Sequence, residues 1–119
     1  MIDSVLTLLK KAREIISDPS RWTQRSYART TDSIICSIDH EYAFSWCSAG
    51  AIYHCAVSIA WSNRIRSHLT GMAYDELQRT CRDIEPLHNL IAFNDNHSHS
   101  EVLAMWDKTI QRLENGYAV

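Results

Sequence analysis

Glycine and proline are scarce in this chain, which has three and two of them among 119 residues. Such scarcity argues against a disordered chain and against an all-β fold rich in turns. No stretch approaches about 18 apolar residues without a charge, so a membrane-spanning helix is not expected. The amino-terminal residues also lack a basic region followed by an apolar run, so we expect no signal peptide.

Closely spaced cysteine pairs are missing as well. Cys36, Cys47, Cys55 and Cys81 lack the C-x-x-C spacing of zinc and redox motifs. We therefore expect reduced, mostly buried thiols in a cytoplasmic protein of bacterial type. The net charge of −2 gives no general attraction for nucleic acid or for an anionic membrane, so neither is an expected partner.

The composition that is present fits one globular domain over residues 1–119, with 45% hydrophobic and 22% charged residues. Apolar residues at helical spacing predict helices over residues 3–17, 40–61, 73–84 and 99–115. The stretch 40–61 is apolar on nearly every face, which is typical of a buried helix. The sequence therefore predicts a mainly α or small α+β fold, a compact bundle of about four helices around this central helix.

The segments between these helices carry weaker signals. Residues 26–38 are rich in Thr, Ser, Tyr and Ile, which favours a short β-hairpin that turns at Thr31-Asp32. Residues 62–71 are polar and basic and predict the end of the central helix followed by a loop. Residues 87–93 are apolar and fit either a short helix or an extended segment.

Three local signals predict how particular elements begin or pack. Asp18 is expected to cap a short turn that has Pro19 at its first position. Ser98 and Glu101 have the spacing of a capping box at the start of the last helix. Gly50, between two alanines in an apolar stretch, indicates close approach by another backbone.

Two segments far apart in the sequence contain most of the chemically active groups. Residues 46–52 place a thiol and a glycine in an apolar stretch, and residues 92–102 concentrate amide, carboxylate and imidazole groups. A fold that brings these segments together forms either a tightly packed structural junction or a small polar site. The sequence leaves this choice open.

A nucleophile set is the first candidate chemistry. Cys47 would act with His97 or His99 as base, and Asn94 or Asp95 would orient the imidazole. In this hypothesis Cys47, His99 and Asp95 are the catalytic residues of a small hydrolase or transferase.

The expected helix position argues against an activated thiol. If the helix begins near Asp39, Cys47 lies too far inside it for the helix dipole to lower the thiol pKa. Cys47 is then a small core residue beside Gly50.

A metal site is the second candidate. His97 and His99, with Asp95 and one cysteine, offer the ligand types that zinc prefers. The alternative is that Asn94, Asp95 and Ser98 satisfy free backbone groups at the start of the last helix, with no cofactor.

An acid-free basic stretch is the third candidate. Arg21, Arg25 and Arg29, with Trp22 and Tyr27 between them, could bind an anionic ligand or an acidic partner, and the aromatic rings suit stacked bases. The alternative is a solvated face on which the arginine stems cover apolar surface.

Three motifs extend over most of the chain. They are Asp18-Pro19-x-x-Trp22-Thr23, Trp46-Cys47-x-x-Gly50-Ala51, and Phe93-Asn94-Asp95 followed by His99-x-Glu101-Val102. In these motifs the chain resembles an uncharacterised family of small bacterial and phage-encoded proteins. The resemblance implies one compact domain of bacterial or mobile-element origin and carries no catalytic residue across.

The leading functional hypothesis is a non-enzymatic, cytoplasmic interaction module with a protein partner, in one form a phage or mobile-element protein that acts on a host factor. A homodimer is one arrangement of this kind, because four tryptophans are enough to supply both a core and an interface. The alternatives are the Cys/His-dependent enzyme and a protein that binds a metal or an anionic ligand.

Overall fold

The computed structural model describes residues 2–59 and 62–116. Within these ranges the elements follow in the order α1 (Ile2–Ile16), η1 (Pro19–Arg21), β1 (Ala28–Thr30), β2 (Ile35–Cys36), β3 (Ala43–Trp46), α2 (Ser48–Ile59), α3 (Asn63–Ile84), α4 (Leu90–Asn96) and α5 (His99–Gly116). The prediction of a mainly helical fold with a small β component is confirmed.

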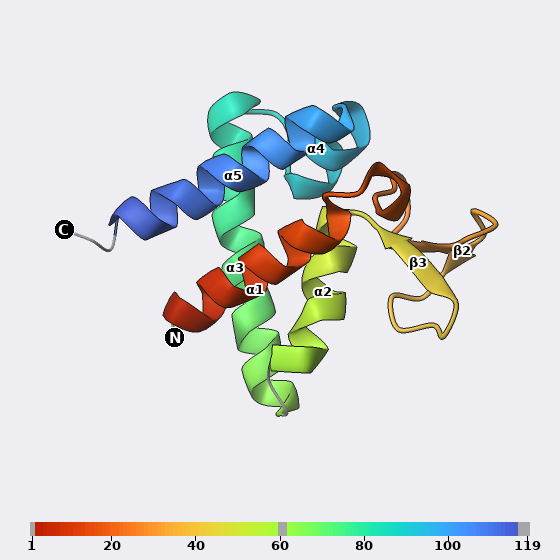
Figure 1. The fold of residues 1–119 in the computed structure, drawn as a ribbon. Coiled ribbons are helices and arrows are strands. Elements are labelled where there is room, and N and C mark those ends of the chain that lie inside the picture. The colour runs from red at the N-terminus through yellow and green to blue at the C-terminus, as the bar shows by residue number, and fades with distance from the viewer. Residues whose placement is uncertain (1, 60–61, 117–119) are drawn as a thin grey trace.

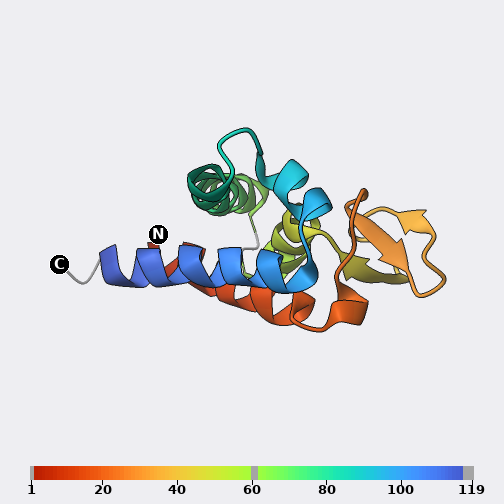
Figure 2. The same cartoon turned by 90° about the horizontal axis from the view of Figure 1, so that it is seen from above.

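The helices form a body of two layers, and the sheet extends from one end of it. Helices α1 and α5 lie along one another and cross α2 and α3, as both views show (Figures 1 and 2). The sheet lies beside the start of α2, away from the carboxyl end of α5 (Figure 1). No helix among the described residues is long and apolar enough to cross a membrane.

Helix α1 agrees closely with the predicted helix 3–17. Its buried face consists of Val5, Leu8, Leu9, Ala12 and Ile16. On its outer side the Arg13 guanidinium donates two hydrogen bonds, of 2.7 and 3.0 Å, to the Asp107 carboxylate of α5. Lys10 and Glu114 add an ion pair of 3.2 Å between the same helices. Burial supplies most of the stabilisation here, because exposed ion pairs contribute little.

The predicted central helix over 40–61 is wrong in its first half. Residues Ala43–Trp46 form β3, and α2 begins only at Ser48. A strand of four residues is too short to show its own period, and periodicity alone does not separate a short apolar run from part of a buried helix. The prediction of a buried helix is confirmed for the first five residues of α2, which are all buried, whereas Val57 in its last turn is 63% exposed. The predicted end at residue 61 lies outside the described residues.

The predicted loop over 62–71 is also wrong. Helix α3 begins at Asn63, and the Ser62 hydroxyl caps it by accepting a hydrogen bond from the Ile65 N–H. The first turns of α3 are polar because they are mostly solvent-exposed, and its buried residues begin at Leu69. Periodicity therefore detects only the second half of this helix. For the segment 87–93 the sequence allowed either a short helix or an extended segment. The structure is helical from Leu90.

The sheet is antiparallel with strand order β2-β1-β3. The predicted hairpin in residues 26–38 is present as β1 and β2, and its turn extends past Thr31-Asp32 to Ser33, which has a φ of 64°. The register places Ala28 opposite Cys36 on one side and opposite Trp46 on the other. Strand β3, which the sequence did not predict, gives the hairpin the third strand that it needs for stability.

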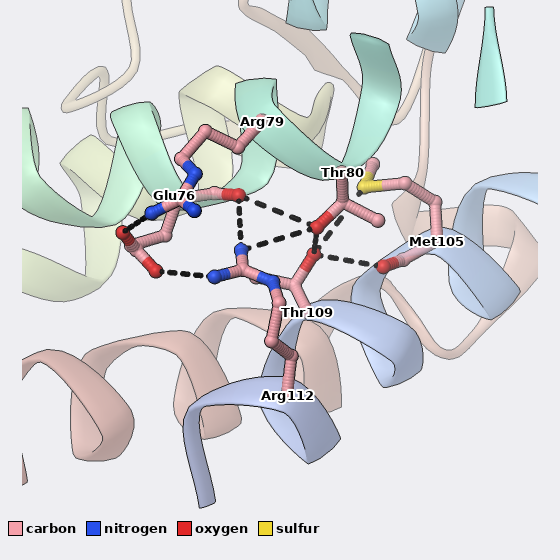
Figure 3. Close-up of polar contacts among 6 residues, drawn as sticks. All are labelled: Glu76, Arg79, Thr80, Met105, Thr109 and Arg112. Atoms are coloured by element: carbon pink, nitrogen blue, oxygen red, sulfur yellow. Dashed lines mark hydrogen bonds and ion pairs between the residues drawn. The ribbon is translucent and has the colours of Figure 1, made fainter. Parts of the chain in front are cut away.

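A buried polar network joins α3 to α5 (Figure 3). The Thr109 Oγ1 atom lies 2.7 Å from Thr80 Oγ1 and 2.9 Å from the Met105 carbonyl oxygen. The Arg112 guanidinium donates to the Glu76 carboxylate at 3.0 Å and to the Glu76 carbonyl at 2.9 Å. These bonds satisfy polar groups inside the helix interface and fix how the two helices pack.

Candidate functional site

The two segments rich in chemical groups do meet, at the start of α2 and along α4. Asn94, only 1% exposed, lies at the centre of the contact. Its Oδ1 accepts hydrogen bonds from Trp22 Nε1 at 2.9 Å, from the Ser48 N–H at 3.0 Å and from the Ser48 hydroxyl at 2.8 Å. Its Nδ2 donates to the Thr23 carbonyl at 3.0 Å and to Asp95 Oδ1 at 3.3 Å. One buried amide thus joins three parts of the chain.

Further bonds surround this amide. Trp106 Nε1 of α5 donates to the Ser48 hydroxyl at 3.0 Å. Gln24 Nε2 donates to the carbonyl oxygens of Asn94 and His97, each at 3.0 Å. We call this set of bonds the Asn94 junction. Of the two arrangements that the sequence left open, a packed structural junction is therefore present.

Gly50 permits the close contact next to the junction. A Cβ atom at this position would lie 2.1 Å from the Tyr27 carbonyl oxygen, a distance that excludes any side chain. The same carbonyl accepts the Cys47 N–H at 3.3 Å. The predicted close approach of another backbone at Gly50 is confirmed.

Cys47 lies directly before α2 rather than inside it. Its Sγ accepts the Gly50 N–H at 3.3 Å, so the thiol caps the helix that begins at Ser48. The expectation that Cys47 lies deep within a helix is therefore wrong. Burial nevertheless raises the pKa of the Cys47 thiol, and Asp95 adds to this rise, while the N–H groups of Gly50 and Ala49 oppose it. The thiol is held in its neutral form.

The two imidazoles near this segment make other contacts. His97 Nδ1 lies 2.9 Å from the Phe93 carbonyl oxygen, and its ring stacks on Phe93 with centroids 3.8 Å apart. His99 Nε2 lies 2.6 Å from the Ile16 carbonyl oxygen, and its ring packs against Trp22. In the described part of the chain, neither imidazole hydrogen-bonds to a thiol, and no three acidic, thiol or imidazole groups are placed to hold a metal ion.

Two of the three arginines of the basic stretch have structural partners. Arg21 Nε donates to the Phe44 carbonyl at 3.2 Å, and its guanidinium lies over the Phe44 ring. Arg29 donates to the Ser33 carbonyl at 3.1 Å and to the Gln24 carbonyl at 3.3 Å. Trp22, predicted with them, donates to the Asn94 junction.

Arg25 differs from its two neighbours. Its φ of 64° is unusual for a residue with a side chain, and the backbone is held there by a 2.8 Å hydrogen bond from its N–H to Asp95 Oδ1. Its guanidinium is exposed and has neither a hydrogen bond nor an ion pair with any described residue. Arg25 is thus the member of the basic stretch whose charge is available to a ligand.

A cavity of about 410 Å³ lies beside the junction, and we call it the Cys47 cavity. Its lining includes Arg25, Tyr27, Cys47, Ile91 and Asp95. Cavities of this volume, mostly apolar with a few polar groups, are typical of small-molecule sites. Cys47 and Asp95 of the proposed nucleophile set thus line one cavity, whereas His97 and His99 are not among its lining residues.

Two further hollows adjoin it and share Tyr27. One, of about 470 Å³, has Tyr27, Ile35 and Tyr53 in its lining, and the other, of about 410 Å³, has Tyr27, Tyr53 and Tyr74. Sequence reasoning missed Tyr53 and Tyr74 as surface residues of interest. No spacing rule links the three tyrosines, because they come from the segment before β1, from α2 and from α3, which meet only in the folded chain.

The fold and the site define a small helical domain with a three-stranded antiparallel sheet, in which a buried polar junction lies beside a ligand-sized cavity. The chain belongs to the family described as a family of unknown function (DUF6197), which matches residues 1–112. Membership of an uncharacterised family is therefore confirmed, and a bacterial or phage origin stays a prediction. Comparison with curated proteins and with solved structures found no match.

Proposed function

We propose that this protein is a non-enzymatic binding module for a protein partner. Its contact surface is the Tyr27 face, which we define as Tyr27, Ile35, Tyr53 and Tyr74. The observation that carries the proposal is the convergence of three tyrosines, from the segment before β1, from α2 and from α3, around adjoining hollows. Action on a host factor by a phage or mobile-element protein is one concrete form of this function.

The chemistry of the Tyr27 face suits protein recognition. Tyr27 is 47% and Ile35 is 62% exposed, and the rings of Tyr27 and Tyr53 have centroids 6.2 Å apart. Across the described residues, none of the three phenol hydroxyls has a hydrogen-bond partner. Tyrosine combines a large rigid apolar ring with one polar tip, and it is enriched at protein interfaces for this reason.

The ionisation state of the tyrosines also favours binding. Burial raises the pKa of Tyr53 and of Tyr74 above the ordinary tyrosine value. Both hydroxyls therefore keep their protons further into the alkaline range than an ordinary tyrosine does, and remain hydrogen-bond donors for a partner.

The environment of Cys47 supports a binding role over an enzymatic one. A nucleophilic thiol needs a lowered pKa or an adjacent base. Burial raises the pKa of Cys47. The imidazoles of His97 and His99 lie within hydrogen-bond distance of backbone carbonyl oxygens and not of the thiol. The residues that suggested a nucleophile set thus have packing roles.

Affinity capture with two matched tyrosine variants tests the proposal. Wild-type protein, Tyr27→Ala and Tyr42→Ala would be immobilised and exposed to extract of the source organism. Tyr42 is the control because it is 67% exposed and lines none of the three hollows. We expect the wild type and Tyr42→Ala to capture the same protein, and Tyr27→Ala to bind it about tenfold more weakly when it is purified and titrated.

Equal binding of that protein by Tyr27→Ala would contradict the proposal. Sedimentation of the three purified proteins separates the homodimer from other partners. If the partner is a second copy, the wild type and Tyr42→Ala sediment as dimers and Tyr27→Ala as a monomer.

A further inference from the structure

We propose that the Cys47 cavity binds a small zwitterion with the chemistry of an α-amino acid that has an apolar side chain. This inference goes beyond the proposed function, because it concerns a free small molecule and not a protein partner. It rests on two residues of opposite charge, Arg25 and Asp95, which line one cavity and form no ion pair with any residue that the structure describes.

The negative charge belongs to Asp95. Its Oδ1 accepts the Arg25 N–H at 2.8 Å and the Asn94 side-chain amide at 3.3 Å, which fixes the carboxylate in place. Its Oδ2 receives no hydrogen bond from any part of the chain that the structure describes. An oriented carboxylate with one free oxygen is a suitable acceptor for an ammonium group.

The positive charge belongs to Arg25, and it does not neutralise Asp95. The two residues are adjacent, since the Arg25 backbone bonds to the Asp95 carboxylate, yet no ion pair joins their side chains. A ligand with only a negative charge would be repelled by Asp95, and one with only a positive charge would be repelled by Arg25. A molecule that has both charges complements both residues.

The remaining lining supplies an apolar surface. Ala49 and Ile91 give the cavity aliphatic surface for an apolar side chain.

Titration of ¹⁵N-labelled protein with three related compounds tests this inference. The probes are L-leucine, isoamylamine, which lacks the carboxylate, and 4-methylpentanoate, which lacks the ammonium group. We expect L-leucine to give saturable amide shifts at Arg25, Ala49 and Ile91. Each analogue should bind at least about tenfold more weakly than L-leucine. The absence of saturable shifts at about 10 mM L-leucine would overturn the proposal. Equal binding of either analogue, or shifts confined to other surfaces, would overturn it too.

Two charge variants locate the contacts. Asp95→Asn keeps an oxygen that accepts the Arg25 N–H, and Arg25→Gln changes only an exposed side chain. We expect each variant to weaken L-leucine binding about tenfold. Asp95→Asn should remove the preference for L-leucine over 4-methylpentanoate, and Arg25→Gln should remove the preference over isoamylamine. A folded variant that binds as the wild type does would overturn the proposal, and Arg25→Gln decides alone if Asp95→Asn does not fold. No protein partner enters this measurement, so its failure leaves the proposed function intact, and the reverse also holds.

Discussion

At the scale of single residues, Asn94 stabilises the fold out of proportion to its size. Replacing it in Asn94→Ala leaves the Trp22 indole N–H, the Ser48 N–H and the Thr23 carbonyl without their buried partner. Unsatisfied buried groups cost about 1–3 kcal/mol each, so we expect a loss of about 3 kcal/mol in the free energy of unfolding. Urea denaturation measures this loss directly.

Asn96 provides the matched control on the same helix. Its exposed side chain donates one hydrogen bond, of 2.7 Å, to the Ala92 carbonyl. Asn96→Ala should change stability by no more than about 0.5 kcal/mol. Similar losses in the two variants would mean that the Asn94 junction contributes little.

A second residue-scale prediction compares two helical glycines. Alanine favours a helix over glycine by about 1 kcal/mol, so propensity alone predicts that both replacements stabilise. Gly71→Ala should do so, because no heavy atom lies within 4 Å of the new Cβ. Gly50→Ala should instead destabilise by about 3 kcal/mol, because its Cβ would overlap the Tyr27 carbonyl. Thermal unfolding of both variants shows the sign of each change, and a stabilised Gly50→Ala would contradict the packing described here.

Single residues also show what the sequence could reveal. The close approach at Gly50 and the caps by Asp18 and Ser98 follow from residue type and spacing alone, and each is present in the structure. The role of Asn94 does not follow, because its partners come from segments that are distant in the chain. Short-range chemistry was therefore predictable, and long-range partners were not.

At the scale of elements, the boundary between β3 and α2 determines how Cys47 is interpreted. Residues 43–59 read as one apolar stretch, although a strand and a helix divide it at Cys47. Strand β3 pairs with β1, and Trp46 forms an isolated β-bridge with Trp22. No local sequence pattern encodes these long-range contacts. Tertiary contact thus overrides the helical period, and the thiol moves from a helix interior to a helix start.

The α3–α5 interface supports a prediction about a pair of residues. Thr80 is 1% exposed and Thr109 is fully buried, and their hydroxyls are mutual partners at 2.7 Å. Thr80→Val and Thr109→Val should each cost about 1 kcal/mol, because each leaves the other hydroxyl without this partner. The double variant should cost about 1 kcal/mol less than the sum of the two. Four urea denaturation curves close this cycle, and additive losses would show that the hydroxyls do not interact.

At the scale of the whole molecule, the junction holds the sheet against the helical body. Trp22 and Thr23 lead into the sheet, Ser48 follows it, and all three bond to Asn94 of α4. The sequence marked the two chemically rich segments, but it did not predict that they meet, because their contact depends on elements that are distant in the chain. The Tyr27 face was not predictable either, because its tyrosines come from the segment before β1, from α2 and from α3, which meet only in the fold.

Global stability should decline in mild alkali because of buried thiols. Burial raises the pKa of Cys55 from 9.0 to about 11 and that of Cys81 from 9.0 to about 12. Below pH 9 both the folded and the unfolded chain keep these protons. Above pH 9 the unfolded chain releases them first, so stability falls as the pH rises toward the folded-state values.

Ionisation of these two thiols in the unfolded chain should lower the free energy of unfolding by about 1.5 kcal/mol between pH 8 and pH 9.5. Urea midpoints at the two pH values measure this loss, and tyrosine ionisation contributes little in that window. Cys81→Ala has its own lower baseline, but its pH-dependent loss in the free energy of unfolding should be about 0.8 kcal/mol smaller than that of the wild type. An unchanged pH dependence in this variant would assign the alkaline loss to other groups.

The Asn94 junction also bears on the order in which the chain folds. Asn94 accepts hydrogen bonds from Ser48 and Trp22, which lie 46 and 72 positions before it in the sequence. Closing such long loops costs entropy before the bonds form, so we expect these bonds to be absent from the folding transition state. In stopped-flow experiments, Asn94→Ala should then accelerate unfolding and leave the refolding rate nearly unchanged. One buried amide would thus determine how long the native state lasts, and not how quickly it is reached.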